Sequence, residues 1–354
     1  MKNESLSPAA GARRNRGFSL VELLVALVIG SFLIIGAVTV YVQSRNTYAV
    51  NETVSRLQEN ARYALSVVEP DIRLANYWGL INDASMITGT ASNLPLATGT
   101  APDCGPGFDT DLERPLIGVN NDYTLACAAY ALGTPDPDFS RTPDTIVVRH
   151  ADELTAAPDA QKVQVYTTRQ GGNSQIFRSA SAPGAPGALV AVPPAGPRAE
   201  VRDLVVRAYY VSDRSSQAAT PSLRRKSLNR GPAFDDEEIL PGVEDMQVQF
   251  GIDLGADDNG DGVVDDTDAN GMPDRYNGIA TRYVNPGDPV LNTAQVVAVR
   301  VWLLVRAESP EVGFRNNPAR PFTYADVVYA PDDSFRRLLV SRTIQIRNTV
   351  NLQT

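Results

Sequence analysis

The chain has 354 residues, of which 43% are hydrophobic, 26 are glycine and 25 are proline. This length is enough for an N-terminal anchor followed by one large or two small domains with a buried core. The formal net charge of −9 argues against non-specific binding of nucleic acid by the bulk surface, which would require a basic face.

The N-terminal region combines a basic cluster with a long apolar run, RRNRGFSLVELLVALVIGSFLIIGAVTVYVQ at residues 13–43. As a helix, the 25 residues from Phe18 to Val42 would be about 38 Å long, enough to cross a hydrocarbon core of about 30 Å. The preceding arginines place the N-terminus in the cytoplasm and the rest of the chain across the membrane. An ordinary cleaved secretory signal fits less well, because no small-residue cleavage site follows the run.

Glu22 is the one charged residue inside this run. A carboxylate within a membrane helix costs up to about 2.5–3.5 kcal/mol, and less near the interface. It is either an incidental residue that reaches back to the interface or a functional residue with a specific partner.

The segment Arg16-Gly17-Phe18-Ser19-Leu20-Val21-Glu22, followed by an apolar helix, resembles the class III signal of type IV prepilins. In that family a prepilin peptidase cuts after the glycine, here Gly17, and the new N-terminal Phe18 is N-methylated. The glutamate, here Glu22, pairs with the N-terminal amine of a neighbouring subunit. Each of these two charges would remove the desolvation penalty of the other.

The resemblance implies a domain organisation and a location. Residues 1–17 would be the leader peptide, 18–43 the transmembrane and filament-core helix, 44–76 the head-packed half of the same helix, and 77–354 a β-rich periplasmic head. The chain would lie in the inner membrane as a single-pass protein and enter the pilus fibre after assembly. Its partners would be the prepilin peptidase, other minor pilins and the major pilin, with no nucleic acid.

The apolar spacing continues beyond the membrane run to about residue 76. Apolar side chains recur every three or four residues from Val50 to Leu74, while charged side chains occupy the opposite face. This pattern predicts one helix of about 88 Å from residue 18 to 76. Pro70 should kink or tighten its last turns.

The remainder of the chain carries strand signals separated by loops. Residues 80–103 and the Pro/Gly/Ala-rich 180–199 are predicted to be loops. Residues 243–253 alternate cleanly between apolar and polar side chains, and 295–307 are apolar on both faces, which indicates a central strand. Further strands are predicted at 143–150, 162–168, 174–179, 204–212 and 224–229, and 335–348 is predicted to be a helix or strand followed by a strand.

The two cysteines, Cys104 and Cys127, would both lie outside the cytoplasm, where disulfides persist. We predict a bridge between them, which would contribute on the order of 3 kcal/mol. The alternative is two free buried thiols.

An acidic segment at 257–274, DDNGDGVVDDTDANGMPD, matches the spacing of a calcium loop. Alternate oxygens point inward from such a loop, a glycine (here Gly262) allows the sharp turn, and a backbone carbonyl supplies position 7. The predicted ligands are therefore Asp257, Asn259, Asp261, Val263, Asp265 and Asp268. An overlapping set could hold a second ion: Asp266, Asp268, Asn270, Gly271 and Asp274. Asp268 replaces the usual glutamate at position 12, and the alternative is a solvated acidic loop without a metal.

No catalytic motif stands out in the sequence. A Gly-rich phosphate loop, G-x-S-x-G, H-E-x-x-H and CxxC are all absent, and the single histidine, His150, ends a predicted strand, where a structural or exposed role is expected. The chain is therefore predicted not to be an enzyme.

The order of the signals in the head, with its paired cysteines and Arg-rich ending, resembles PilW-type minor pilins. This resemblance implies an α+β pilin-like fold, in which a long N-terminal helix packs on an antiparallel β-sheet head with large loops. The expected function is that of a minor pilin in type IV pilus assembly or priming, with links to adhesion and twitching motility. The alternatives are a minor pseudopilin of a type II secretion system and a membrane-tethered, calcium-dependent adhesin or binding module.

Overall fold

The computed structural model describes 17–89, 104–105, 108–155, 158–159, 161–169, 174–178, 199–230, 233–254, 278–292 and 294–351. Contacts within the chain divide it into two compact units, Met1–Thr53 and Val54–Thr354.

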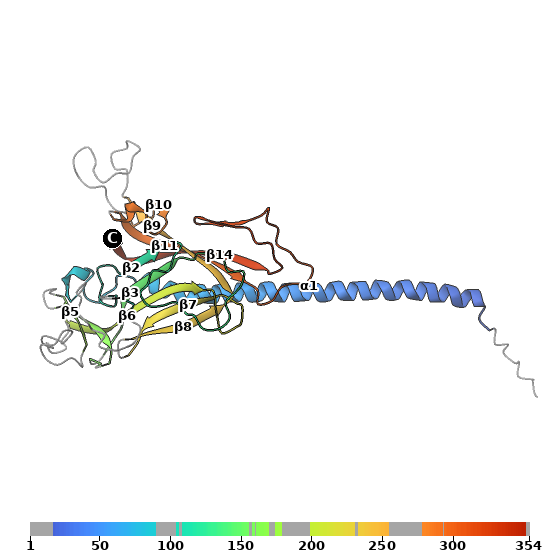
Figure 1. Cartoon of the computed structure of the whole chain (residues 1–354), viewed down its shortest axis with the longest axis horizontal. Helices are drawn as coiled ribbons and strands as arrows, with labels where there is room; N and C mark the ends of the chain where they lie inside the picture. Colours follow the sequence, from blue (N-terminus) through green and yellow to red (C-terminus); the bar gives the residue numbers. More distant parts are fainter. Residues whose placement is uncertain are drawn as a thin grey trace, which may run out of the picture. The chain divides into compact units, whose positions relative to one another are not determined.

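The first unit consists, in its described part, of the beginning of helix α1 (Leu20–Leu74), the long blue helix in Figure 1. Every described residue before Leu57 is at least partly exposed. Within α1 an 18-residue window reaches a mean hydropathy of 2.8, so by length and composition this helix could cross a membrane. A helix that is apolar on all sides is suited to lipid or to a protein interior rather than to water.

In the second unit the end of α1 buries a single stripe of side chains. Its members are spaced by three, four or seven residues and are Leu57, Ala61, Ala64, Leu65, Val68, Asp71 and Ile72. The helix continues for one turn beyond Pro70. It ends at Leu74. Asn76, two residues later, has a left-handed φ of 63°, and its side-chain oxygen accepts a hydrogen bond from the indole nitrogen of Trp78 at 2.8 Å.

The larger sheet has eight strands around the long strand β6 (Ala199–Ser212). One edge of β6 pairs first with β4 and then with β7, while its other edge pairs with β3. The remaining pairs are antiparallel except for the short parallel pair β1–β5. The other strands are β1 (Ile87–Thr88), β2 (Leu116–Val119), β3 (Thr145–Leu154), β4 (Val163–Thr168), β5 (Ser174–Arg178), β7 (Ser222–Leu228) and β8 (Phe234–Pro241).

The second sheet has four antiparallel strands in the order β10-β9-β11-β14. They are β9 (Val243–Asp253), β10 (Arg282–Val284), β11 (Gln295–Arg306) and β14 (Arg337–Asn351). A separate hairpin joins β12 (Phe322–Tyr324) to β13 (Val327–Tyr329). Two short 3-10 helices, Ala84–Met86 and Pro289–Asn292, complete the described elements.

The main core lies where the buried stripe of α1 meets both sheets. It includes Val68 and Ile72 from the helix, Ile146 and Tyr209 from the larger sheet, and many apolar residues of β9 and β11. A second, smaller core around Trp78 covers the other face of the larger sheet. The expected α+β architecture, with a long helix packed on antiparallel strands, is therefore confirmed.

Several local predictions need correction. The head contains two main sheets rather than one. Of the predicted segment 335–348, residues 337–348 belong to the single strand β14, so no helix forms there. Strand β6 begins at Ala199, at the end of the predicted loop. The prediction also missed β8, FDDEEILP, because its acidic residues hide the strand pattern. Three of them lie opposite the basic residues of β7, in the pairs Arg224–Glu238, Arg225–Glu237 and Lys226–Asp236.

Candidate functional site

The proposed cleavage point precedes the helix. Residues 17–19 are not helical, and Phe18 is 88% exposed. A peptide bond between Gly17 and Phe18 is therefore in an open segment, which is the conformation that a peptidase requires of its substrate. A Cβ added to Gly17 would meet no other atom within 4 Å.

Glu22 forms a capping box with Ser19 at the start of α1. The Ser19 backbone N–H donates to the Glu22 carboxylate at 2.9 Å, and the Glu22 backbone N–H donates to the Ser19 hydroxyl at 3.2 Å. The two side chains thereby satisfy two of the backbone donors that a helix leaves unpaired at its N-terminus. The Ser-x-x-Glu spacing in the sequence is typical of this cap, which was not among the sequence-based predictions.

Asp71 is the only buried charged residue of α1, and it fixes the helix to the larger sheet. Its carboxylate accepts hydrogen bonds from Arg207 at 2.6 Å and from the Tyr209 hydroxyl at 2.5 Å. His150, predicted to be structural or exposed, is buried with its Nε2 3.5 Å from the same carboxylate. Burial alone would raise the pKa of Asp71, but the interactions with His150, Arg207 and Tyr209 outweigh it and hold this pKa below its ordinary value.

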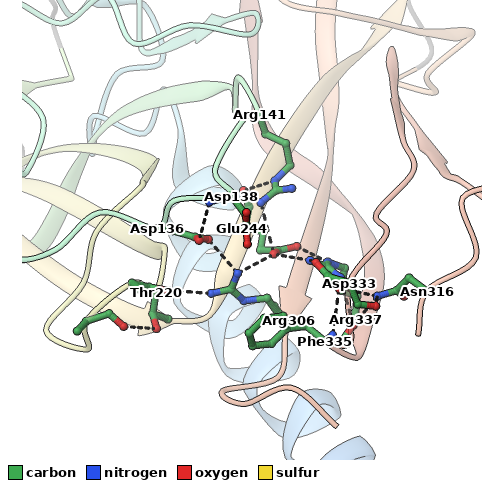
Figure 2. Close-up of polar contacts among 12 residues, drawn as sticks. Asp136, Asp138, Arg141, Thr220, Glu244, Arg306, Asn316, Asp333, Phe335 and Arg337 are labelled. Carbon is green, nitrogen blue, oxygen red and sulfur yellow. Dashed lines mark hydrogen bonds and ion pairs between the residues drawn. The ribbon is translucent and has the colours of Figure 1, made fainter. Parts of the chain in front are cut away.

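A second buried cluster surrounds Glu244, whose side chain is fully buried (Figure 2). Arg337 forms a bidentate pair with it at 2.6 and 2.9 Å. Arg306 and Arg141 approach the same carboxylate at 3.3 and 3.4 Å. We call these three arginines and Glu244 the arginine cluster.

The arginine cluster is neutralised by two further carboxylates. Asp136 accepts from Arg306 at 2.9 Å, and Asp333 accepts from Arg337 at 2.6 Å, so three cations face three anions. Glu244 lies at the start of β9, Arg306 ends β11 and Arg337 begins β14. The cluster therefore ties together three strand ends. Because it is buried and charge-balanced, its role is structural.

Asp144 is another buried carboxylate in the head. It accepts backbone hydrogen bonds from Asn121 and Val248, both at 2.7 Å, and so joins the turn after β2 to β9. Burial raises the pKa of Asp144 to about 7, against the lowering effect of these two hydrogen bonds. Among the described residues around Asp144, around Asp71 and in the arginine cluster, no nucleophile is positioned beside a base.

The structure joins Cys104 and Cys127, the predicted pair, in a disulfide. The bridge connects residues 23 positions apart, and both cysteines are buried. The closed segment contains β2 and precedes β3.

The predicted calcium ligands, from Asp257 to Asp268, and the overlapping second set lie outside the described residues. What the structure does describe is the frame of this segment. β9 and β10 are antiparallel neighbours, with Ile252 opposite Arg282. At the same end of the pair, the Gly278 backbone N–H donates to the buried Asp253 carboxylate at 2.6 Å.

Comparisons with known proteins agree with this arrangement. Residues 12–38 match the prokaryotic N-terminal methylation motif, and residues 208–348 match type IV pilus-assembly protein W. The chain is thus similar to PilW-type type IV pilus-assembly proteins over residues 208–348 and to prepilins at its N-terminus. The first match contains Gly17, Phe18 and Glu22, and the second contains β9, β11 and most of β14, including Glu244, Arg306 and Arg337.

Other comparisons add little. No curated protein matches the chain. Among solved structures, a type IV-like pilin from Thermus thermophilus is similar, with 14% identity, a TM-score of 0.27, and coverage of 58% of this chain and 78% of that one. Pilin-family proteins are structural and non-enzymatic. The methylation motif implies processing by a prepilin peptidase, partners in a pilus and a membrane-anchored precursor.

Proposed function

We propose that this chain is a minor pilin that primes or caps type IV pilus assembly at the inner membrane. The observation that carries the proposal is the coincidence of the methylation motif with an apolar helix half that buries no side chain in its own chain. Such a surface requires lipid before assembly and neighbouring helices afterwards. The large head, with its long loops, suits a rare subunit better than a repeated one.

A deletion strain tests this function. If the chain primes assembly, cells lacking it should lose surface pili, measured by shearing and electron microscopy, while protein secretion stays normal. Complementation with the wild-type gene should restore the pili. Normal piliation with a secretion defect would instead favour the second candidate, a minor pseudopilin of type II secretion. A loss of attachment with normal pili would favour a tethered adhesin.

We also propose that the segment Asp257–Asp268 binds Ca²⁺. The spacing of the oxygen-bearing residues supports this proposal, because it matches that of a calcium loop. The clustered carboxylates support it too, since they repel one another unless a cation is present. The antiparallel β9–β10 pair supports it further, since it brings Ile252, which precedes the segment, opposite Arg282, which follows it. Calcium at a hundredfold excess over Kd should increase the free energy of unfolding by about 2.7 kcal/mol, and the melting temperature should rise accordingly.

Calorimetry on chelator-treated protein measures this effect. Asp261→Ala should abolish the calcium-dependent shift in melting temperature. The control Asp235→Ala, which removes an acidic residue of β8 outside the segment, should keep that shift. No heat and no shift at millimolar Ca²⁺ would reduce the segment to a solvated acidic loop.

A further inference from the structure

The outer face of the four-stranded sheet carries a stacked row of Tyr283, Arg300 and Trp302. Val299, Val301 and Leu303 of β11 point into the main core, so Arg300 and Trp302 between them point to the opposite face. The Arg300 guanidinium carbon lies 3.7 Å from the centroid of the Tyr283 ring and 5.6 Å from that of Trp302. All three side chains are partly exposed. We call these residues the aromatic row.

A glycine makes room for this stack. Tyr283 on β10 is opposite Gly251 on β9, which is opposite Ala298 on β11. A Cβ at Gly251 would lie 2.8 Å from a ring carbon of Tyr283. The absence of that carbon therefore lets the tyrosine ring lie across β9 and reach Arg300.

Arg300 has an open guanidinium. Its Nε donates to the Thr343 hydroxyl at 3.2 Å, which fixes the plane of the group. Within the described residues no carboxylate pairs with it, although Arg224, Arg306 and Arg337 in the same unit each have one. Its two terminal nitrogens are thus available to an anion in the bidentate geometry that carboxylates prefer.

The neighbours of the aromatic row are polar and uncharged. Across the sheet, Arg300 lies between Gln249 and Thr343, Trp302 has Ser341 beside it, and Ala298 has Gln345. Gln249 in turn donates to the Asn285 side chain at 2.8 Å. Protein interfaces are also enriched in Tyr, Trp and Arg, but the hydroxyl and amide groups around this row are suited to hydrogen bonds with sugar hydroxyls.

We propose that the aromatic row binds an acidic polysaccharide built from uronate residues. A sugar ring would place its C–H groups, which are partially positive, against the negative face of Trp302. The uronate carboxylate would accept two hydrogen bonds from Arg300. The site would give the head a glycan-binding activity that is independent of the assembly role.

Titration of the full-length protein in detergent with polygalacturonate tests the proposal. The chain has two tryptophans; Trp78 is fully buried and Trp302 is partly exposed, so fluorescence reports on the row. We expect saturable quenching that weakens with salt, and no effect from the neutral polymer dextran. Arg300→Gln should weaken binding about tenfold or more, and Gly251→Ala should weaken it by displacing Tyr283.

The matched control is Arg347→Gln, which removes an exposed arginine of β14 outside the row and should leave binding unchanged. Circular dichroism checks that each variant is folded. Equal weakening by Arg300→Gln and Arg347→Gln, or equal binding of dextran, would overturn the proposal. A third outcome would also overturn it: the wild type binds no polymer, and Arg300→Gln loses the pilus subunits that co-purify with the wild type. The face would then be a subunit interface.

Discussion

Glu22 has one carboxylate and two possible tasks. In the isolated chain it caps α1 through the Ser19 N–H, and in an assembled fibre it is proposed to neutralise the amine of a neighbouring subunit. The two tasks are compatible, because a carboxylate has about four lone-pair sites and the cap uses one.

Two substitutions separate these tasks. Glu22→Gln keeps a capping side chain but removes the charge, whereas Glu22→Ala removes both. If the charge drives assembly, both variants should insert in the membrane but be depleted at least about tenfold from sheared pili, because an unpaired buried charge is costly. Quantitative immunoblotting of the pili measures this. Normal recovery of Glu22→Gln would mean that the cap alone matters.

Asp71 allows a prediction of pH dependence. Its pKa in the folded state lies below the ordinary value of 3.8, so its stabilising effect is present above about pH 4 and is lost as the pH falls through the folded-state pKa. Asp71→Asn should lower the free energy of unfolding by about 2–3 kcal/mol at pH 7, because it removes the charged partner of Arg207 and Tyr209.

Urea denaturation followed by the fluorescence of the buried Trp78 measures that difference. The gap between wild type and Asp71→Asn in the free energy of unfolding should narrow below about pH 4, as the pH falls toward the folded-state pKa of Asp71. An equal gap at pH 3 and pH 7 would show that the charge of Asp71 is not what stabilises the helix on the sheet.

At the scale of elements, charged side chains determine how several strands meet. Opposite charges lie across β7 and β8, and one of these pairs, Arg225–Glu237, is partly exposed. By contrast, β9, β11 and β14 meet at the buried arginine cluster. An ion pair has different energetic weight in these two places, because water screens the Arg225–Glu237 pair and does not screen the buried cluster.

This contrast gives a matched pair of variants. Glu244→Gln leaves three buried arginines without their shared carboxylate and should destabilise the head by about 3–5 kcal/mol. Glu237→Gln removes the partner of Arg225 at a half-exposed site and should change stability by less than about 1 kcal/mol. Thermal and urea unfolding compare the two, and equal effects would argue against a structural role for the arginine cluster.

At the scale of the whole molecule, one helix serves two units with opposite requirements. Its first half exposes apolar side chains such as Phe32 and Ile35, while its second half buries a narrow stripe in the head. Under the proposed function, we expect such a chain to be inserted in the membrane first and transferred to a fibre later, with removal of the leader between the two stages.

Processing is therefore testable on the intact protein. The mature wild-type chain should have the mass expected from Phe18 onward with one added methyl group. Replacing Gly17 with valine should leave the leader attached, because a β-branched side chain at the cleavage point blocks the peptidase, and the protein should remain in the membrane fraction. Mass spectrometry decides it; a wild-type chain that still begins before Gly17 would contradict the prediction.

Local sequence determined the N-terminal part of this protein, up to the end of α1 at Leu74. The membrane run, the helix from Leu20 to Leu74 and the motif around Gly17 are set by the composition and spacing of neighbouring residues, which act within a few turns. The same holds for β9, whose apolar and polar residues alternate, and for β11, which is apolar on both faces. With two cysteines, Cys104 and Cys127 had no other partner to pair with; the alternative was two free thiols, and the structure joins them in a disulfide.

Tertiary structure decided everything that depends on strand order. Nothing near Glu244 in the sequence indicates Arg337, which lies 93 positions away, and Arg207 finds Asp71 across 136 positions. The aromatic row likewise joins β10 to β11 across β9. Such partners are fixed by register between strands, and a shift of one residue would turn each side chain to the other face of its sheet. For this reason the sequence predicted the family and the anchor, while the buried clusters and the outer face of the sheet emerged only from the folded chain.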